Sequence, residues 1–214
     1  MALQARAEAT RRKIIETAVE LFGQIGYGET GLAGVLQRAG VSKGAFYYHF
    51  DSKEAVATAI IDEFNNRTVT AVEENFDAAA PTLDGIIAST FAVQGLMHRD
   101  PATQIGQQLA QALNQVSSAG SRVYTGWTAA FVEMAGGVAR AGGLRPDVDP
   151  VDVGEAIWAG ILGSHLVSAA CGDDPYVRLA RSWRMLVSSI APHDEVSRLH
   201  ELLDDIVDRY QAAV

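Results

Sequence analysis

The sequence predicts an all-α protein with a small N-terminal three-helix domain and a larger C-terminal helical domain. Apolar residues recur at three- and four-residue spacing through most of the 214 residues. Glycine and proline residues divide the chain into segments of helical length, and a pattern of short helix, tight turn and short helix lies at about residues 31–50. The expected helices are 6–25, 31–39, a short helix within 40–50, 51–76, 82–98, 101–113, 122–141, 151–172, 175–190 and 193–210.

The composition is that of a globular protein whose charge is unevenly distributed. Apolar residues make up 48%, charged residues 20%, and the net charge is −9. Residues 1–53 carry a net charge of +2 and the rest carries −11, so an acidic body would repel DNA everywhere except at the N-terminal face. Because no apolar segment typical of a signal peptide opens the chain, we expect a cytoplasmic protein. The single cysteine, Cys171, excludes an internal disulfide and is expected to be buried.

The first two expected helices, 6–25 and 31–39, precede the turn. Four basic residues cluster near the start of the first helix, where the helix dipole favours acidic ones. They are either solvated surface charges or a basic arm beside a recognition helix. Thr30 is placed to cap the second helix, which carries two glycines, Gly31 and Gly34, each costing ~1 kcal/mol relative to alanine. The basic residues are Arg6, Arg11, Arg12 and Lys13.

The stretch 40–50 is compact, aromatic and basic. Gly40 is expected to end the second helix, and Ser42 to cap the next one. Phe46 and Phe50 are four residues apart and therefore share the buried face. The outer residues can bond to phosphate oxygens, although an ordinary surface helix with an aromatic edge is the alternative. These outer residues are Lys43, Gly44, Tyr47, Tyr48 and His49.

The run 14–53 closely resembles the DNA-binding domain of TetR-type transcriptional regulators. In a helix-turn-helix the second helix enters the major groove. The resemblance implies that Thr30, Tyr47, His49 and Lys53 contact phosphates, and that Lys43, Gly44, Ala45 and Tyr48 face the groove. The residues that carry it are Ala18, Leu21, Phe22, Gly26, Tyr27, Thr30, Ala39, Gly40, Val41, Lys43, Gly44, Tyr47, Tyr48, His49, Phe50 and Lys53.

The chemistry of the recognition helix agrees with this resemblance. The ammonium of Lys43 can donate to guanine O6 and N7, whereas the Ala45 methyl can only make an apolar contact, as with a thymine methyl. Gly44 leaves room for a close approach of the backbone. Lys53 opens the next helix, whose N-terminal amides also suit a phosphate.

The later helices are expected to bind a ligand and a second subunit. We place the domain boundary near Phe64, inside the long connecting helix, which gives domains at 1–64 and 65–214. Residues 117–120 are expected to form a loop. The segment 151–172 is apolar, but Ser164, His165 and Ser168 interrupt it, so it is too short to span a membrane. TetR-like proteins use their last helices as a four-helix dimer interface, and the resemblance therefore implies a homodimer through the last long helices.

Two segments, 5–11 and 124–127, resemble the γ-butyrolactone-receptor branch of the TetR family. That branch uses a tryptophan at the position of Trp127 against its ligand. Candidate pocket residues would form a mostly apolar cavity with a few polar groups, although each can equally be a core residue and His165 a satisfied buried histidine. The candidates are Phe91, Met97, Tyr124, Trp127, Phe131, Trp158 and His165.

The function implied by the resemblance is a homodimeric repressor on an inverted-repeat operator in double-stranded DNA. A small apolar effector, either a γ-butyrolactone-type signal or an antibiotic-like molecule, would release it. A ligand-independent DNA-binding regulator is the alternative. An all-helical enzyme is the third class, but no Glu has a His three residues later, no histidines show metal-ligand spacing, and no phosphate-binding glycine loop is present. We therefore expect no catalytic residue, metal or cofactor.

Overall fold

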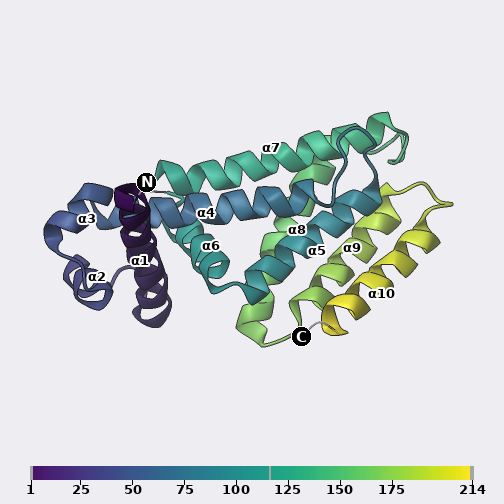
Figure 1. Cartoon of the computed structure of the whole chain (residues 1–214). Helices are drawn as coiled ribbons and strands as arrows, with labels where there is room; N and C mark the ends of the chain where they lie inside the picture. Colours follow the sequence, from purple (N-terminus) through teal and green to yellow (C-terminus); the bar gives the residue numbers. More distant parts are fainter. Residues whose placement is uncertain (1, 116, 213–214) are drawn as a thin grey trace. The chain divides into compact units, whose positions relative to one another are not determined.

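The computed structural model describes residues 2–115 and 117–212, which form ten α-helices and no strand (Figure 1). This confirms the predicted all-α fold. One compact unit runs to Arg67 and also contains Asp100–Val123, and the other contains Thr68–Arg99 and the chain from Tyr124 onward. The helices are α1 (Ala2–Ile25), α2 (Leu32–Ala39), α3 (Lys43–His49), α4 (Lys53–Glu73), α5 (Leu83–Arg99), α6 (Pro101–Leu113), α7 (Ser118–Arg140), α8 (Pro150–Cys171), α9 (Pro175–Ile190) and α10 (Val196–Ala212).

The first unit has a core of apolar side chains from one face of each of its helices. Ile14 and Ala18 of α1 are fully buried, as is Phe46 of α3. Val35 of α2 and Ile60 of α4 are 1% and 2% exposed. Burying one such large side chain contributes roughly 1.5–3 kcal/mol. The short helices α2 and α3, which would be unstable alone, are therefore stabilised by burial against the longer helices of the unit.

Helix α6 belongs to the first unit, which differs from the predicted division at Phe64. A Cβ atom on Gly106 would lie 2.4 Å from Cβ of Phe64, so the glycine allows α6 to approach α4 closely. A Cβ on Gly23 of α1 would likewise lie 3.4 Å from the Ile105 side chain. Residues 100–123 return to the first unit through this packing. No local sequence pattern predicts this return, because it depends on contacts with residues distant in the chain.

The turn between α2 and α3 follows the predicted geometry, but the start of α2 does not. Gly40 has φ 62° and ends α2, and the Ser42 hydroxyl accepts a 3.1 Å hydrogen bond from the Ala45 amide, which confirms both predictions. The prediction that Thr30 caps α2 is wrong. Gly31 is the N-cap without a side-chain hydrogen bond, and the Thr30 hydroxyl instead donates to the Gly26 carbonyl at 2.7 Å.

Helix α7 begins earlier than predicted, at Ser118 within the expected loop 117–120. The Ser117 hydroxyl accepts a hydrogen bond from the Ala119 amide at 3.3 Å and so supports the first turn. A Cβ on Gly120 would lie 2.8 Å from the Ala110 carbonyl oxygen, so the first turn of α7 packs directly on α6. Glycine favours a loop in isolation, but here it permits the helix to pack.

The second unit is a bundle in which α8 lies beside α9, and α9 beside α10 (Figure 1). Asp149 and Asp174 cap α8 and α9, and a proline follows each cap at the first helical position. In the core, the Trp183 indole nitrogen donates a 2.8 Å hydrogen bond to the Thr90 hydroxyl. A Cβ on Gly154 would lie 2.4 Å from the Val132 amide nitrogen, so α7 and α8 approach closely.

Helix α8 corrects two predictions. Its 22 residues are long and apolar enough to cross a membrane by length and composition, so the expectation that this segment is too short is wrong. Its inward face is nevertheless packed within the bundle, where Ile161 is fully buried. Cys171 is exposed rather than buried, because it lies on the last turn of α8 next to the C-cap Gly172.

Candidate nucleic-acid interface and effector region

Helix α3 presents a polar, aromatic surface on a well-anchored scaffold. Phe46 is fully buried and Phe50 is 6% exposed, with their ring centroids 6.0 Å apart. On the opposite side, Tyr48 is 78% exposed and Tyr47 is 46% exposed. A Cβ on Gly44 would meet nothing within 4 Å, so the backbone of α3 is open to an approaching partner there.

The outer side chains of α3 support one another. The Lys43 ammonium lies 5.9 Å from the Tyr47 ring centroid, and the rings of Tyr48 and His49 meet edge to face at 4.9 Å. Lys43 is exposed, and Ala45 and His49 are partly exposed. Six of the predicted DNA contacts therefore lie together on the short helix α3. Their cationic, hydroxyl and imidazole groups suit phosphates and base edges.

Thr30 and Lys53, the other two predicted phosphate contacts, are engaged in the protein's own hydrogen bonds. Thr30 is 1% exposed. The Lys53 ammonium donates to the carbonyls of Tyr27 and Thr30 at 2.7 and 2.8 Å, and lies 4.2 Å from the Tyr27 ring centroid. In this conformation the Thr30 side chain is not presented to a phosphate, and Lys53 joins the loop before α2 to the start of α4.

Arg11 is a candidate contact that the motif did not single out. Its guanidinium carbon lies 5.3 Å above the Phe50 ring, in a cation–π arrangement that fixes α1 against the end of α3. The Lys13 ammonium lies 3.8 Å from the position that a Cβ on Gly40 would take. The basic cluster at the start of α1 therefore includes residues beside the recognition helix. The excess of positive charge in this segment was the sequence signal that could have identified them as candidate DNA contacts.

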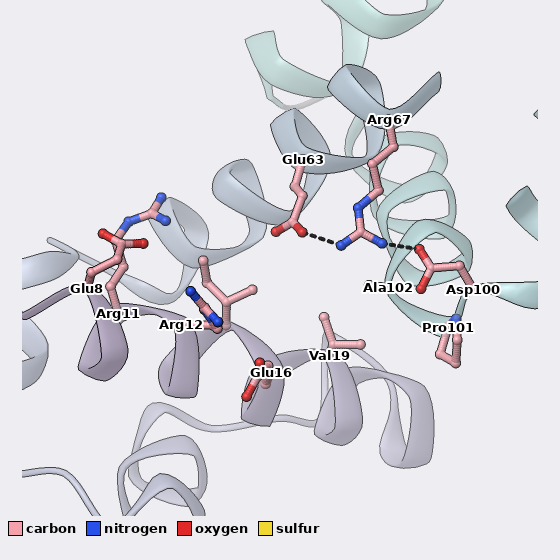
Figure 2. A pocket seen from close by; sticks show the side chains of 11 residues that line it. Glu8, Arg11, Arg12, Glu16, Val19, Glu63, Arg67, Asp100, Pro101 and Ala102 are labelled. Carbon is pink, nitrogen blue, oxygen red and sulfur yellow. Dashed lines mark hydrogen bonds and ion pairs between the residues drawn. The ribbon is translucent and has the colours of Figure 1, made fainter. Parts of the chain in front are cut away.

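A cavity of about 630 Å³ lies within the first unit, between α1, α4 and the start of α6. Figure 2 shows Arg67 of α4 reaching Asp100, the N-cap of α6, with Glu63 on its other side. Burial alone would raise the pKa of Asp100, but hydrogen bonds from Thr103 and the charge of Arg67 lower it overall. The lining is rich in both signs of charge and does not resemble the apolar pocket that the sequence predicts.

Four of the seven predicted pocket residues form one aromatic cluster in the second unit. Trp158 of α8 lies 6.2 Å from Trp127 and 6.1 Å from both Phe131 and Tyr124 of α7, measured between ring centroids. Trp127, Phe131 and Trp158 are 5%, 1% and 6% exposed, and burial raises the pKa of the Tyr124 hydroxyl. This group, Tyr124, Trp127, Phe131 and Trp158, is called the aromatic cluster below.

The other three predicted pocket residues lie elsewhere in the unit. Phe91 packs its ring 6.1 Å from Tyr210 of α10, and Met97 is fully buried on α5. His165 lies two turns after Trp158 on α8, with its Nδ1 3.4 Å from the side-chain nitrogen of Gln94. Sequence reasoning missed Gln94, because a polar residue in an apolar helix is indistinguishable from a surface one until the helix is packed.

Comparison with known proteins identifies the family. Residues 14–60 match the family of bacterial regulatory proteins described as the tetR family. The chain is also 34% identical to the A-factor receptor protein of Streptomyces griseus over 193 residues, which cover 89% of this chain and 67% of that protein. The chain belongs to the TetR family.

Solved structures of TetR proteins share the fold along almost the whole chain. A γ-butyrolactone receptor described as ArpA-like has a TM-score of 0.78 and 26% identity, covering 95% of this chain and 99% of the receptor. CprB of Streptomyces coelicolor, solved with its biological operator sequence, has a TM-score of 0.77 and 27% identity, covering 95% and 99% of the two chains. This TetR protein is therefore a helix-turn-helix transcriptional regulator similar to γ-butyrolactone receptors, and not an enzyme.

Proposed function

We propose that this regulator is a homodimeric repressor that a small, mostly apolar molecule releases from an inverted-repeat operator. The outward face of α3 is the observation that carries the DNA-binding part. Lys43, Gly44, Ala45 and Tyr48 contact bases there. Tyr47 and His49 contact phosphates, and Arg11 adds a cation beside them. Lys53 and Thr30 contribute indirectly, by holding the loop that precedes α2.

Exposed apolar side chains on α8 and α9 support the dimer. Leu166 and Val167 of α8 are 41% and 42% exposed, and Met185 of α9 is 74% exposed. A second copy that covers these two helices would remove apolar surface from water. A two-fold dimer presents its two recognition helices symmetrically, so the operator is an inverted repeat with half-sites about one helical turn, ~34 Å, or somewhat more apart. The site of action is the cytoplasm, where the operator DNA lies.

The aromatic cluster is the part of the second unit best suited to the effector. Its buried rings provide an apolar surface, and the relatives with similar structures include γ-butyrolactone receptors. We assign the effector to that chemical class, and the charged cavity of the first unit does not suit it. The effector releases DNA only if it binds the DNA-incompetent state more tightly, since equal affinity for both states would shift nothing.

Recovery of operator DNA tests this function. Purified protein is incubated with sheared genomic DNA of its source organism, and the bound fragments are sequenced and footprinted. We expect two symmetric protected half-sites, a steep fall of affinity with salt, and release by a γ-butyrolactone. No enrichment of any fragment would contradict the DNA-binding assignment. Retention of the operator at saturating concentrations of every lactone tested would favour a ligand-independent regulator.

A further inference from the structure

A cavity of about 330 Å³ lies on the second unit, between the segment that follows α4, helix α5 and helix α10. This volume is at the lower end of the range for small-molecule sites, roughly 300–1,000 Å³. Two apolar side chains form one part of the lining, and polar or cationic side chains form the rest. The lining residues are Ala88 and Ile206, followed by Asn75, Arg99, Arg209 and Tyr210. None of them belongs to the aromatic cluster, so this cavity is separate from the proposed effector region.

Two arginines of the cavity carry charges that no ion pair balances. Among the residues that the structure describes, neither Arg99 nor Arg209 forms a salt bridge, whereas four other arginines of the same unit are paired with carboxylates. Each of the two instead donates from Nε to a carbonyl of its own helix, Arg99 to Gly95 at 3.4 Å and Arg209 to Asp205 at 3.3 Å. The terminal nitrogens of both guanidinium groups therefore keep N–H donors for a ligand.

Both guanidinium groups lie near the Tyr210 side chain. The guanidinium carbon of Arg99 is 5.6 Å from the Tyr210 ring centroid. Burial raises the pKa of the Tyr210 hydroxyl, while the positive charges of Arg99 and Arg209 act in the opposite direction. Because a Coulomb interaction weakens with distance, this effect requires both cations to lie close to one hydroxyl. The two like charges therefore face one site, where a ligand with two negative charges would balance them.

A buried hydroxyl without a partner adjoins the same group. Tyr176 of α9 is 2% exposed, and its hydroxyl has no hydrogen-bond partner within the described part of the chain. Its ring stacks on Tyr210 with centroids 4.9 Å apart. A Cβ on Gly95 would lie 2.9 Å from a terminal nitrogen of Arg99 and 3.7 Å from the Tyr176 hydroxyl oxygen. Since a guanidinium only donates, the hydroxyl and the arginine both lack an acceptor here.

We propose that Arg99 and Arg209 bind a phosphate monoester in this cavity. Its organic group packs against Ala88 and Ile206. Asn75 adds a donor, because its side-chain nitrogen donates one hydrogen bond, at 2.8 Å, to a carbonyl of α4 and keeps a second N–H. The inference goes beyond the proposed function and does not depend on it.

The charge of the ligand follows from the two arginines. Guanidinium groups match phosphate oxygens in geometry, and a phosphate monoester carries about −1.5 to −2 charges at pH 7. A phosphate diester carries a single charge and would leave one arginine unbalanced. The phosphates of a DNA strand are diesters, so the cavity is expected to select a small monoester over the DNA backbone.

Binding to the full-length protein is measured by NMR titration at pH 7.5 with three probes that share one aromatic ring. These are phenyl phosphate, its monoanionic diester methyl phenyl phosphate, and uncharged phenol. We expect phenyl phosphate to bind with a dissociation constant of about 1 mM or lower. The diester should bind at least fivefold more weakly, and phenol should show no measurable binding.

Arginine variants locate the site. Arg99→Gln and Arg209→Gln should each weaken phenyl phosphate binding at least tenfold, because each loses a charge-assisted hydrogen bond. The control Arg181→Gln removes an exposed cation of α9 that does not line the cavity, and should change binding less than twofold. Lys43→Ala, on the recognition helix, should also change it less than twofold. Melting temperatures are recorded throughout, and since Arg209 is exposed, Arg209→Gln keeps the test valid if Arg99→Gln is destabilised.

Several results would overturn the inference. Phenyl phosphate might be replaced by phenol without loss of affinity, or fail to bind the wild type at all. Unchanged binding to Arg209→Gln would remove the cavity as the site, and a loss confined to Lys43→Ala would place the phosphate on the recognition helix. Equal losses in Arg181→Gln and Arg209→Gln would show a response to net charge alone. Diester binding as tight as that of the monoester would contradict the assignment of the ligand class.

Discussion

The Lys53 ammonium donates a 2.8 Å hydrogen bond to the Thr30 carbonyl, which joins the start of α4 to the loop before α2. A second bond from the same ammonium reaches the Tyr27 carbonyl at 2.7 Å. Because α3 follows α2 after a short turn, the position of the recognition helix depends on this connection. A lysine that the family resemblance associates with phosphate thus has a structural function within the protein.

We therefore expect Lys53→Met to reduce both stability and operator affinity. The loss of two hydrogen bonds to a charged group should lower the free energy of unfolding by about 1.5–3 kcal/mol. Urea denaturation and fluorescence anisotropy with labelled operator measure the two effects. Operator affinity that falls while stability is unchanged would instead show that Lys53 acts only on the DNA.

Lys43→Ala and Tyr47→Phe should weaken operator binding without changing the melting temperature, because both side chains are exposed on α3. We expect losses of about 1–3 kcal/mol for Lys43 and about 1 kcal/mol for the Tyr47 hydroxyl. The matched control is Arg181→Ala, which removes an exposed cation from α9 in the second unit. Equal effects of Lys43→Ala and Arg181→Ala would mean that only net charge matters.

Trp127→Ala should abolish release by the effector and preserve operator binding. The substitution opens the aromatic cluster and should also cost about 3–5 kcal/mol of stability, as for other buried aromatic residues. Trp183→Phe serves as the control, since it loses the hydrogen bond to Thr90 outside the cluster. A normal response in Trp127→Ala would place the effector elsewhere, and a lost response in both variants would indicate destabilisation alone.

Stability should depend on pH through His165. Its folded pKa is lowered from 6.5 by burial and by His98, so between the folded pKa and 6.5 the unfolded chain binds more protons than the native one. The free energy of unfolding therefore rises with pH across this window and is independent of His165 above it. Urea titrations from pH 5 to 7.5 should show this slope in the wild type and a smaller slope in His165→Phe. An NMR pKa of 6.5 or higher for His165 would contradict the prediction.

Local sequence signals were sufficient to predict those parts of the structure that depend only on neighbouring residues. The expected bounds of 101–113 and 175–190 match α6 and α9, because an aspartate cap followed by proline begins each of these helices. Gly40 and Ser42 likewise defined the turn before the recognition helix through backbone conformation and capping. The family resemblance added the nature of the partner, double-stranded DNA.

The hydrogen-bond partners and the burial of side chains depend on residues distant in the chain, and only the tertiary structure decided them. Thr30 and Lys53 carry the same sequence signal as a phosphate-binding pair, but their hydrogen bonds are made within the protein. Gln94 pairs with His165, which lies 71 positions away in the sequence, and Cys171 is exposed on the last turn of α8. The sequence alone determined the helices and the DNA-binding motif, because both rest on local periodicity and capping. The pairing of helices decided which polar groups face water and which are enclosed, because burial is a property of the packed chain.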